Sequence, residues 1–197
     1  MTPPPAAASS RLWLVRHAAP LVAPGTCYGA LDVPADAQAT RAAAERLSTA
    51  LPPGARVAHS TLQRCELLAH DLRALRPDLT FTPDARLREM DFGCWEGKTW
   101  DTIGKSAIDT WVAGFATHAP GGGESLAHML HRVAAALQTA REWRSNQGAK
   151  DVVWITHAGV ARCVAWLQER GESALPRSED WPVAAPGCGE WEIRELA

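Results

Sequence analysis

Short apolar segments, each four to six residues long, recur along the chain and are separated by longer amphipathic stretches. Continuous apolar character of this length is typical of strands that are buried on both faces of a sheet. The run with Val152, Val153 and Ile155 is the most strand-like, because β-branched residues favour strands. The pattern predicts strands at residues 12–15, 56–59, 79–82 and 151–156, and an edge strand at 190–194.

Between these segments, apolar residues recur every three or four positions, as on the buried face of a helix. This spacing predicts helices at residues 39–50, 62–75, 124–146 and 160–170. Pro52, Pro53 and Gly54 end the first of them. A loop rich in Pro and Gly covers 20–34, and the weakly periodic stretch 83–123 predicts short helices around Trp100 and Trp111.

Alternating strands and helices predict an α/β fold, a three-layer sandwich with a mostly parallel central sheet and helices on both faces. Residues 11–197 are expected to form a single domain, with a cap-like insertion at about 83–123. Residues 1–10, rich in Pro, Ala and Ser, are expected to be a disordered tail. In such sheets, ligands bind beyond the carboxyl ends of the strands.

Composition narrows the class of protein. The 197 residues are 46% hydrophobic and 21% charged, with a net charge of -2, which disfavours a nucleic-acid surface. No apolar run is long enough to cross a membrane, and the N-terminus lacks the pattern of a signal peptide. Five scattered cysteines without a Cys-x-x-Cys motif predict a reducing, cytoplasmic location. Nothing in the pattern indicates an oligomeric state.

Polar residues follow three of the predicted strands. Arg16 and His17 end the first, Arg64 lies one helical turn beyond the second, and His157 and Gly159 follow the late strand. Arginine matches phosphate oxygens with a planar fork of donors, and a neutral imidazole can act as a nucleophile. Amide groups near Gly159, at a helix start, would add donors for an anion. The sequence therefore predicts a phosphate pocket.

Each of these residues alone has a simpler interpretation. A histidine at a strand end is more often a packing or capping residue, and Arg64 alone would be an ordinary helix-surface charge. His128 and His131 lie three residues apart on a helix and could hold a metal, but no further ligand is near, so an exposed stripe is expected. The convergence of three strand ends favours the functional interpretation.

These motifs resemble those of the histidine phosphatase, or phosphoglycerate-mutase-like, superfamily. The resemblance runs from residue 11 to about 167 and rests on LVRH at 14–17, STLQR at 60–64, LREMDFGCWEG at 87–97 and THAG at 156–159. It implies a phosphohistidine on His17, phosphate binding by Arg16, Arg64 and His157, and neither metal nor cofactor. It also places the general acid at Glu89, whereas spacing alone leaves Asp91 and Glu96 as rivals.

A narrower resemblance points to α-ribazole phosphatases of cobalamin biosynthesis. It rests on GTCYGALDVP at 25–34, DFGCWEG at 91–97 and PGGGES at 120–125. It implies removal of the 5′-phosphate from α-ribazole phosphate or adenosylcobalamin phosphate, with substrate contacts from Thr26, Cys27, Tyr28 and Ser125. The tryptophan-rich insertion suits stacking against an aromatic base.

The chain departs from the family pattern at several positions. Ala18 replaces the usual Gly after the first histidine, residues 21–24 lack a common Asn, and Ala30 replaces a common Arg. Thr26 is expected to substitute for the missing Asn, near Ala23. The alternative hypothesis is therefore that the protein is a broad-specificity or sugar-phosphate phosphatase of the same superfamily. A non-catalytic binder of phosphorylated ligands is a third hypothesis, disfavoured because a binder needs neither a nucleophile nor an acid.

Overall fold

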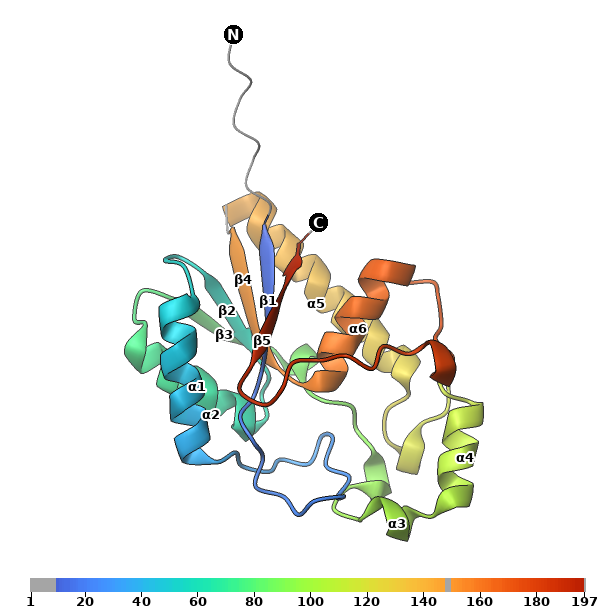
Figure 1. Cartoon of the computed structure of the whole chain (residues 1–197). Coiled ribbons are helices and arrows are strands. Elements are labelled where there is room, and N and C mark those ends of the chain that lie inside the picture. Colours follow the sequence, from blue (N-terminus) through green and yellow to red (C-terminus); the bar gives the residue numbers. More distant parts are fainter. Residues whose placement is uncertain (1–9, 148–149, 197) are drawn as a thin grey trace.

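The computed structural model describes residues 10–147 and 150–196, which form a five-stranded sheet between two layers of helices (Figure 1). The sheet order is β3-β2-β4-β1-β5, and β5 is antiparallel to its neighbour. The strands are β1 (Arg11–Arg16), β2 (Arg56–His59), β3 (Thr80–Pro83), β4 (Asp151–Thr156) and β5 (Trp191–Glu195). The predicted α/β sandwich, with its mostly parallel sheet and an edge strand near 190–194, is confirmed.

Strands β1 and β4 lie side by side at the centre of the sheet, in parallel register from Arg11 opposite Asp151 to Arg16 opposite Thr156. Because the two strands end at the same level, the residue after each strand emerges at the same point. The backbone N–H of His17 donates to the carbonyl of Thr156 at 3.1 Å. This register brings together two motifs that are 140 positions apart in the chain.

Alternate residues of the central strands pack against different helix layers. Leu12, Leu14 and Trp154 face α5 (Leu126–Gln147) and α6 (Ala158–Arg170). Trp13 and Ile155 face α1 (Ala37–Ala50) and α2 (Gln63–Leu75). Burial on both faces explains why these strands read as continuous apolar runs rather than alternating ones.

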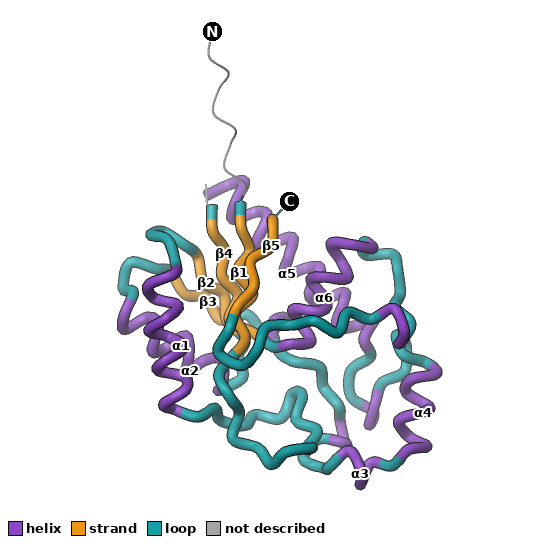
Figure 2. The backbone as a smooth tube through the Cα atoms, in the orientation of Figure 1, coloured by secondary structure: helices purple, strands orange, loops and turns teal. Residues whose placement is uncertain are grey.

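The segment between β3 and α5 lies beside the carboxyl ends of the strands (Figure 2). It contains the single-turn 3₁₀ helices at 85–87, 93–95 and 120–122, together with α3 (Trp100–Ile103) and α4 (Lys105–Ala113). The predicted short helices near Trp100 and Trp111 are thus present. A second long connection, from α6 to β5, includes a 3₁₀ turn at 178–180 and passes the same edge of the sheet.

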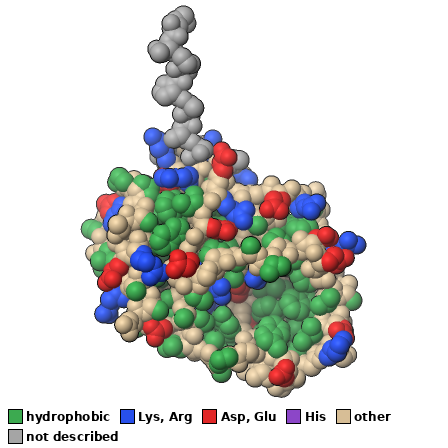
Figure 3. Space-filling model, in the orientation of Figure 1, with side chains coloured by type: hydrophobic (Ala, Val, Ile, Leu, Met, Phe, Trp, Pro, Cys, Tyr) green, Lys and Arg blue, Asp and Glu red, His purple; other side chains and the backbone are tan. Residues whose placement is uncertain are grey.

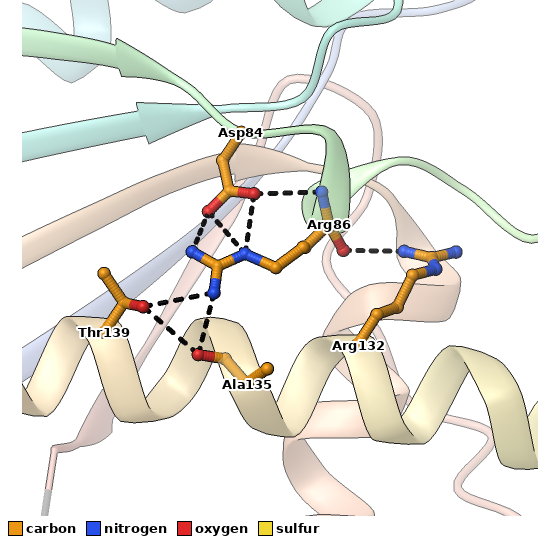
Figure 4. A network of polar contacts seen from close by, with 5 residues as sticks. All are labelled: Asp84, Arg86, Arg132, Ala135 and Thr139. Carbon is orange, nitrogen blue, oxygen red and sulfur yellow. Dashed lines mark hydrogen bonds and ion pairs between the residues drawn. The ribbon is translucent and has the colours of Figure 1, made fainter.

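Two arginines attach the start of the inserted segment to the neighbouring helix (Figure 4). Arg86 pairs with Asp84 at 2.7 Å and donates to the carbonyl of Ala135 at 3.0 Å on α5. Arg132, on α5, donates to the carbonyls of Arg86 and Arg88 at 2.6 and 2.7 Å. This network holds the backbone immediately before Glu89 against a long, packed helix.

The predicted tail at 1–10 lies outside the described residues except for Ser10, whose carbonyl accepts from the amide of Leu196 at 2.8 Å. Within the described residues, none of the helices has the length and apolarity needed to cross a membrane. All five cysteines are free, in agreement with their scattered positions.

Candidate active site

A cavity of about 400 Å³ opens beyond the carboxyl ends of β1 and β4. Figure 3 shows this face of the molecule, with a hollow in its lower half that hydrophobic side chains largely border. Its lining combines charged residues at one end with aromatic and aliphatic ones: Arg16, His17, Thr26, Tyr28, Gly29, Arg64, Glu89, Met90, Phe92, Trp100, Trp111, Phe115, Leu126, Met129, Ala158, Gly159, Arg162 and Trp181.

His17 lies at the buried end of the cavity, with only 2% of its surface exposed. Its Nδ1 is 2.7 Å from the carbonyl oxygen of Ala18. A carbonyl can only accept, so this hydrogen bond places the ring proton on Nδ1 and leaves a lone pair on Nε2. Burial, assisted by the charges of Arg64 and Arg16, lowers the pKa of His17 to about 3, so the ring is neutral at physiological pH.

His157 lies beside His17, with the two ring centroids 5.1 Å apart. Its Nε2 is 2.8 Å from the hydroxyl of Ser60, which follows β2, and 3.5 Å from the thiol of Cys65. Its Nδ1 is buried and has no hydrogen-bond partner among the described residues. Burial holds the pKa of His157 well below its usual value of 6.5. His157 thus adjoins the cavity beside His17 without lining it, and its Nδ1 has unused hydrogen-bonding capacity.

Two arginines complete the polar end. Arg64, on the first turn of α2, is fully buried, and its guanidinium donates to the carbonyls of Gly29 and Leu31 at 2.6 and 2.9 Å. Burial lowers the pKa of Arg64, although an arginine remains a cation. Arg16 donates to the carbonyl of Pro186 at 3.2 Å. The Nε atoms of Arg16 and Arg64 are buried without a partner in the described part of the chain, so each cation retains an unused donor.

Glu89 is half-buried, and the backbone fixes its carboxyl group. Oε1 accepts from the amide of Met90 at 3.0 Å, and Oε2 accepts from the amide of Gly159 at 3.0 Å. A Cβ at position 159 would overlap Oε1, so a larger residue there would push this carboxyl group out of its place. The amide of Gly159, expected to face a phosphate, is thus engaged by Glu89, and its role toward phosphate stays a prediction.

The rival carboxylates have other partners. Glu96 accepts from the amides of Ala30 and Phe92 at 2.7 and 2.9 Å, which ties two loops together. Asp91 is exposed, caps the amide of Gly93 at 2.7 Å and does not line the cavity. Of the three carboxylates, Glu89 is the one that lines the cavity.

The predicted substrate contacts divide into two groups. Thr26 and Tyr28 line the cavity, and the Tyr28 ring lies 5.6 Å from the guanidinium carbon of Arg64. Cys27 is 1% exposed and absent from the lining, and burial, with the charge of Glu96, raises the pKa of its thiol to about 11. Ser125 accepts from the amide of His128 at 3.3 Å, at the start of α5. The contacts of Cys27 and Ser125 with a substrate stay predictions.

The positions that depart from the family pattern lie around the polar end of the cavity and in a neighbouring loop. Ala18 is 1% exposed, and its carbonyl is the group that orients His17. The carbonyl of Ala23 accepts from the amide of Thr26 at 3.2 Å and so supports the residue expected to replace the missing Asn. Ala30 lies outside this cavity, beside a neighbouring one of about 360 Å³.

Sequence reasoning missed two lining residues near the C-terminal connection. Trp181 contacts Phe115 and Trp166, with centroids 6.0 and 6.1 Å apart, and adds an aromatic wall from outside the insertion. Arg162 lines the cavity from α6. Its position one helical turn beyond Gly159, on the same face of the helix, could have identified it from the sequence. No local pattern identifies Trp181, because it belongs to an irregular segment.

Across the described ranges, no group of three or more His, Cys, Asp or Glu side chains could hold a metal ion. His128 and His131 are both exposed on α5, as expected.

Acidification is expected to destabilise the fold. Because the pKa of His17 falls from 6.5 to about 3 on folding, the unfolded chain binds more protons between these values, so stability decreases as pH falls below about 6.5. His157 acts with the same sign. Each histidine contributes at most about 1.4 kcal/mol per pH unit. Urea unfolding at pH 5 to 8 should show a shallower slope for His17→Asn than for the wild type.

His128→Asn, which removes an exposed imidazole, is the matched control for that measurement. Equal slopes for wild type and His17→Asn would contradict a neutral, buried His17.

This chain is similar in sequence and in fold to known phosphatases. The family model "Histidine phosphatase superfamily (branch 1)" matches residues 12–183. A solved structure of mycobacterial glucosyl-3-phosphoglycerate phosphatase has a TM-score of 0.74 and 27% identity, covering 94% of this chain and 89% of that one. The structure of TTHB049 from Thermus thermophilus has a TM-score of 0.63 and 30% identity, covering 93% and 92%. No curated protein matches. The chain therefore belongs to branch 1 of the histidine phosphatase superfamily.

Proposed function

We propose that this protein is a metal-independent phosphomonoesterase that acts through a phosphohistidine on Nε2 of His17. The observation that carries this proposal is the set of buried, unpartnered nitrogens that the described residues place around His17: Nε of Arg16, Nε of Arg64 and Nδ1 of His157. Buried polar nitrogens without partners are costly, and the two arginine Nε atoms are donors, so their presence at one site is best explained by a ligand with several acceptor oxygens. A phosphoryl group has that chemistry.

In the first step, the Nε2 lone pair of His17 attacks phosphorus, and the bond from phosphorus to the ester oxygen breaks. Glu89, entering as a carboxylic acid, gives its proton to the departing oxygen. Arg16 and Arg64 offset the charge on the phosphoryl oxygens, and His157 stabilises them by hydrogen bonding. The products of this step are the alcohol, the phosphohistidine and the Glu89 carboxylate.

In the second step, the Glu89 carboxylate takes a proton from water as the water oxygen attacks phosphorus. The phosphorus–nitrogen bond breaks, the electron pair returns to Nε2 of His17, and phosphate leaves. Glu89 is again an acid, so the cycle closes without a metal ion.

The substrate we propose is α-ribazole 5′-phosphate or adenosylcobalamin phosphate. Phe92, Trp100 and Trp111 pack edge to face, with centroids 5.8 Å from Phe92 to Trp100 and 5.7 Å from Phe92 to Trp111, and all three line the cavity. Such a wall favours a leaving alcohol that carries a flat, apolar base such as dimethylbenzimidazole over one that is a plain sugar. Together with Tyr28, it supports the narrower resemblance to α-ribazole phosphatases.

A second candidate substrate is a sugar phosphate of the glucosyl-3-phosphoglycerate type. The observation in its favour is the structural likeness to the mycobacterial phosphatase of that name. A non-catalytic binder is disfavoured, because two backbone amides hold Glu89 in the cavity, where a binder of anionic ligands would gain nothing from a carboxylate.

A matched pair of substrates isolates the contribution of the aromatic base, dimethylbenzimidazole, to kcat/KM. We expect kcat/KM for α-ribazole 5′-phosphate to exceed that for ribose 5-phosphate by about tenfold or more, since both share the sugar phosphate and one carries the aromatic group. Trp111→Leu should raise KM for α-ribazole 5′-phosphate about fivefold and lower this preference. Trp143→Leu, on α5 and outside the cavity lining, is the control.

All assays include EDTA, and activity that disappears with the chelator would contradict the metal-independent mechanism. Equal kcat/KM for the two substrates would favour broad specificity instead. A higher value for glucosyl-3-phosphoglycerate would favour the second candidate.

A further inference from the structure

We propose that Arg162 forms a second anion-binding subsite, and that the natural substrate carries another negatively charged group on its leaving group. This inference rests on the proposed function. It concerns the chemical class of the substrate: a phosphomonoester whose alcohol also bears a monoanion, such as a phosphodiester or a carboxylate.

The position of Arg162 places it on the leaving-group side. It lies three residues beyond Gly159 on α6, so the two residues share one face of the helix. The amide of Gly159 binds Oε2 of Glu89, the acid that protonates the leaving oxygen. Arg162 lines the same cavity one helical turn farther from the site of phosphoryl transfer.

The guanidinium of Arg162 has little to bind within the protein. Its Nε and Nη2 both donate to one oxygen, the carbonyl of Val183, at 3.3 and 3.2 Å. In the described part of the chain it forms no ion pair with a carboxylate. A guanidinium has five N–H donors in a planar fork, so the Nη1 group remains available for a ligand.

The charges of the cavity leave a place for one more anion in the step where Glu89 acts as the acid. Among the described residues that line it, Arg16, Arg64 and Arg162 are the cations, and Glu89 is the one carboxylate. When Glu89 is protonated as the acid, the three cations face a phosphoryl group that carries two negative charges. A single further negative charge on the leaving group would balance the third cation, and of the three it is Arg162 that lies on that side.

This subsite distinguishes between the candidate substrates by their chemistry. Free α-ribazole 5′-phosphate has no second anion. Adenosylcobalamin phosphate has a phosphodiester on the ribose 3′ oxygen, and glucosyl-3-phosphoglycerate has a carboxylate. The subsite therefore favours the assembled corrinoid phosphate over the free nucleotide.

The test compares α-ribazole 5′-phosphate with the same compound esterified as a methyl phosphodiester at the 3′ oxygen. For the wild type, we expect kcat/KM to be about tenfold or more higher for the diester-bearing substrate, as a charge-assisted hydrogen bond would give. Arg162→Gln should reduce this preference to less than about twofold, mainly through KM, and Arg162→Lys should keep part of it. Arg170→Gln, on the last turn of α6 and outside the cavity lining, should keep the full preference.

Two results would overturn the subsite. The wild type could fail to discriminate between the two substrates, or Arg162→Gln could lower both values by the same factor, as expected if Arg162 only holds the carbonyl of Val183. Failure of the proposed function looks different, because the wild type would then hydrolyse neither substrate or would form no phosphohistidine.

Discussion

Replacing His17 with alanine is expected to lower kcat/KM by about 10⁴-fold or more, for every phosphomonoester that the wild type hydrolyses. The reason is that the variant loses the nucleophile, whereas binding by Arg16 and Arg64 alone leaves only weak residual catalysis. His17 is buried, neutral and held by the carbonyl of Ala18 with Nε2 free, so no other group replaces its lone pair. Steady-state assays with α-ribazole 5′-phosphate measure the loss.

The intermediate provides an independent measurement. Rapid acid-free quenching of the wild type with ³²P-labelled substrate should give a protein label that is labile to acid and stable to base, as a phosphohistidine is. His17→Ala should give no label, whereas His70→Ala, at an exposed position on α2, should label normally. Label in His17→Ala, or normal turnover by it, would assign the nucleophile elsewhere, with His157 as the nearest alternative.

Replacing Glu89 with glutamine is expected to have an effect that depends on the leaving group. For α-ribazole 5′-phosphate, whose departing alkoxide needs a proton, kcat should fall by about 10²- to 10⁴-fold. For p-nitrophenyl phosphate, the first step should be nearly normal, because the phenolate leaves without protonation. Hydrolysis of the phosphohistidine still needs the base, so stopped-flow assays should show a burst of p-nitrophenolate followed by slow turnover.

The rival carboxylate supplies the control. Asp91→Asn keeps the oxygen that caps the amide of Gly93 and should show neither the leaving-group dependence nor the burst. Gly159→Ala should reproduce the Glu89→Gln behaviour more weakly, since its methyl group would displace Oε1 without removing the acid. Equal loss on both substrates for Glu89→Gln would point to a binding role rather than proton transfer.

Much of the fold follows from local patterns. The continuous apolar runs at β1 and β4 reflect burial on both faces of the sheet. The spacing of apolar residues in the helices reflects burial on one face. Both patterns can be recognised within a few residues. The strand-end rule then predicts that Arg16, His17, Arg64 and His157 share one edge of the sheet, because parallel strands present the same end to the ligand. Arg16, His17 and Arg64 line the cavity, and His157 adjoins it beside His17.

Other features depended on knowledge of a family pattern or on the three-dimensional arrangement. Spacing could not choose among Glu89, Asp91 and Glu96, because all three lie in an irregular segment whose side-chain directions have no period. The structure separates them by their partners: Gly159 holds Glu89 at the cavity, whereas the other two carboxylates cap loop amides. The 22-residue helix α5 fixes that segment through Arg132, a contact with no local signature.

Local sequence patterns are enough to predict the alternation of strands and helices, the mostly parallel sheet and the polar residues at the carboxyl ends of its strands. These features depend on the period of burial and on the chemistry of single residues, both of which are local. The three-dimensional fold was needed to show that His17 presents Nε2, that Glu89 contacts Gly159, and that Trp181 and Arg162 complete the cavity. Those features arise from contacts between segments distant in the chain, where packing rather than local preference sets the geometry.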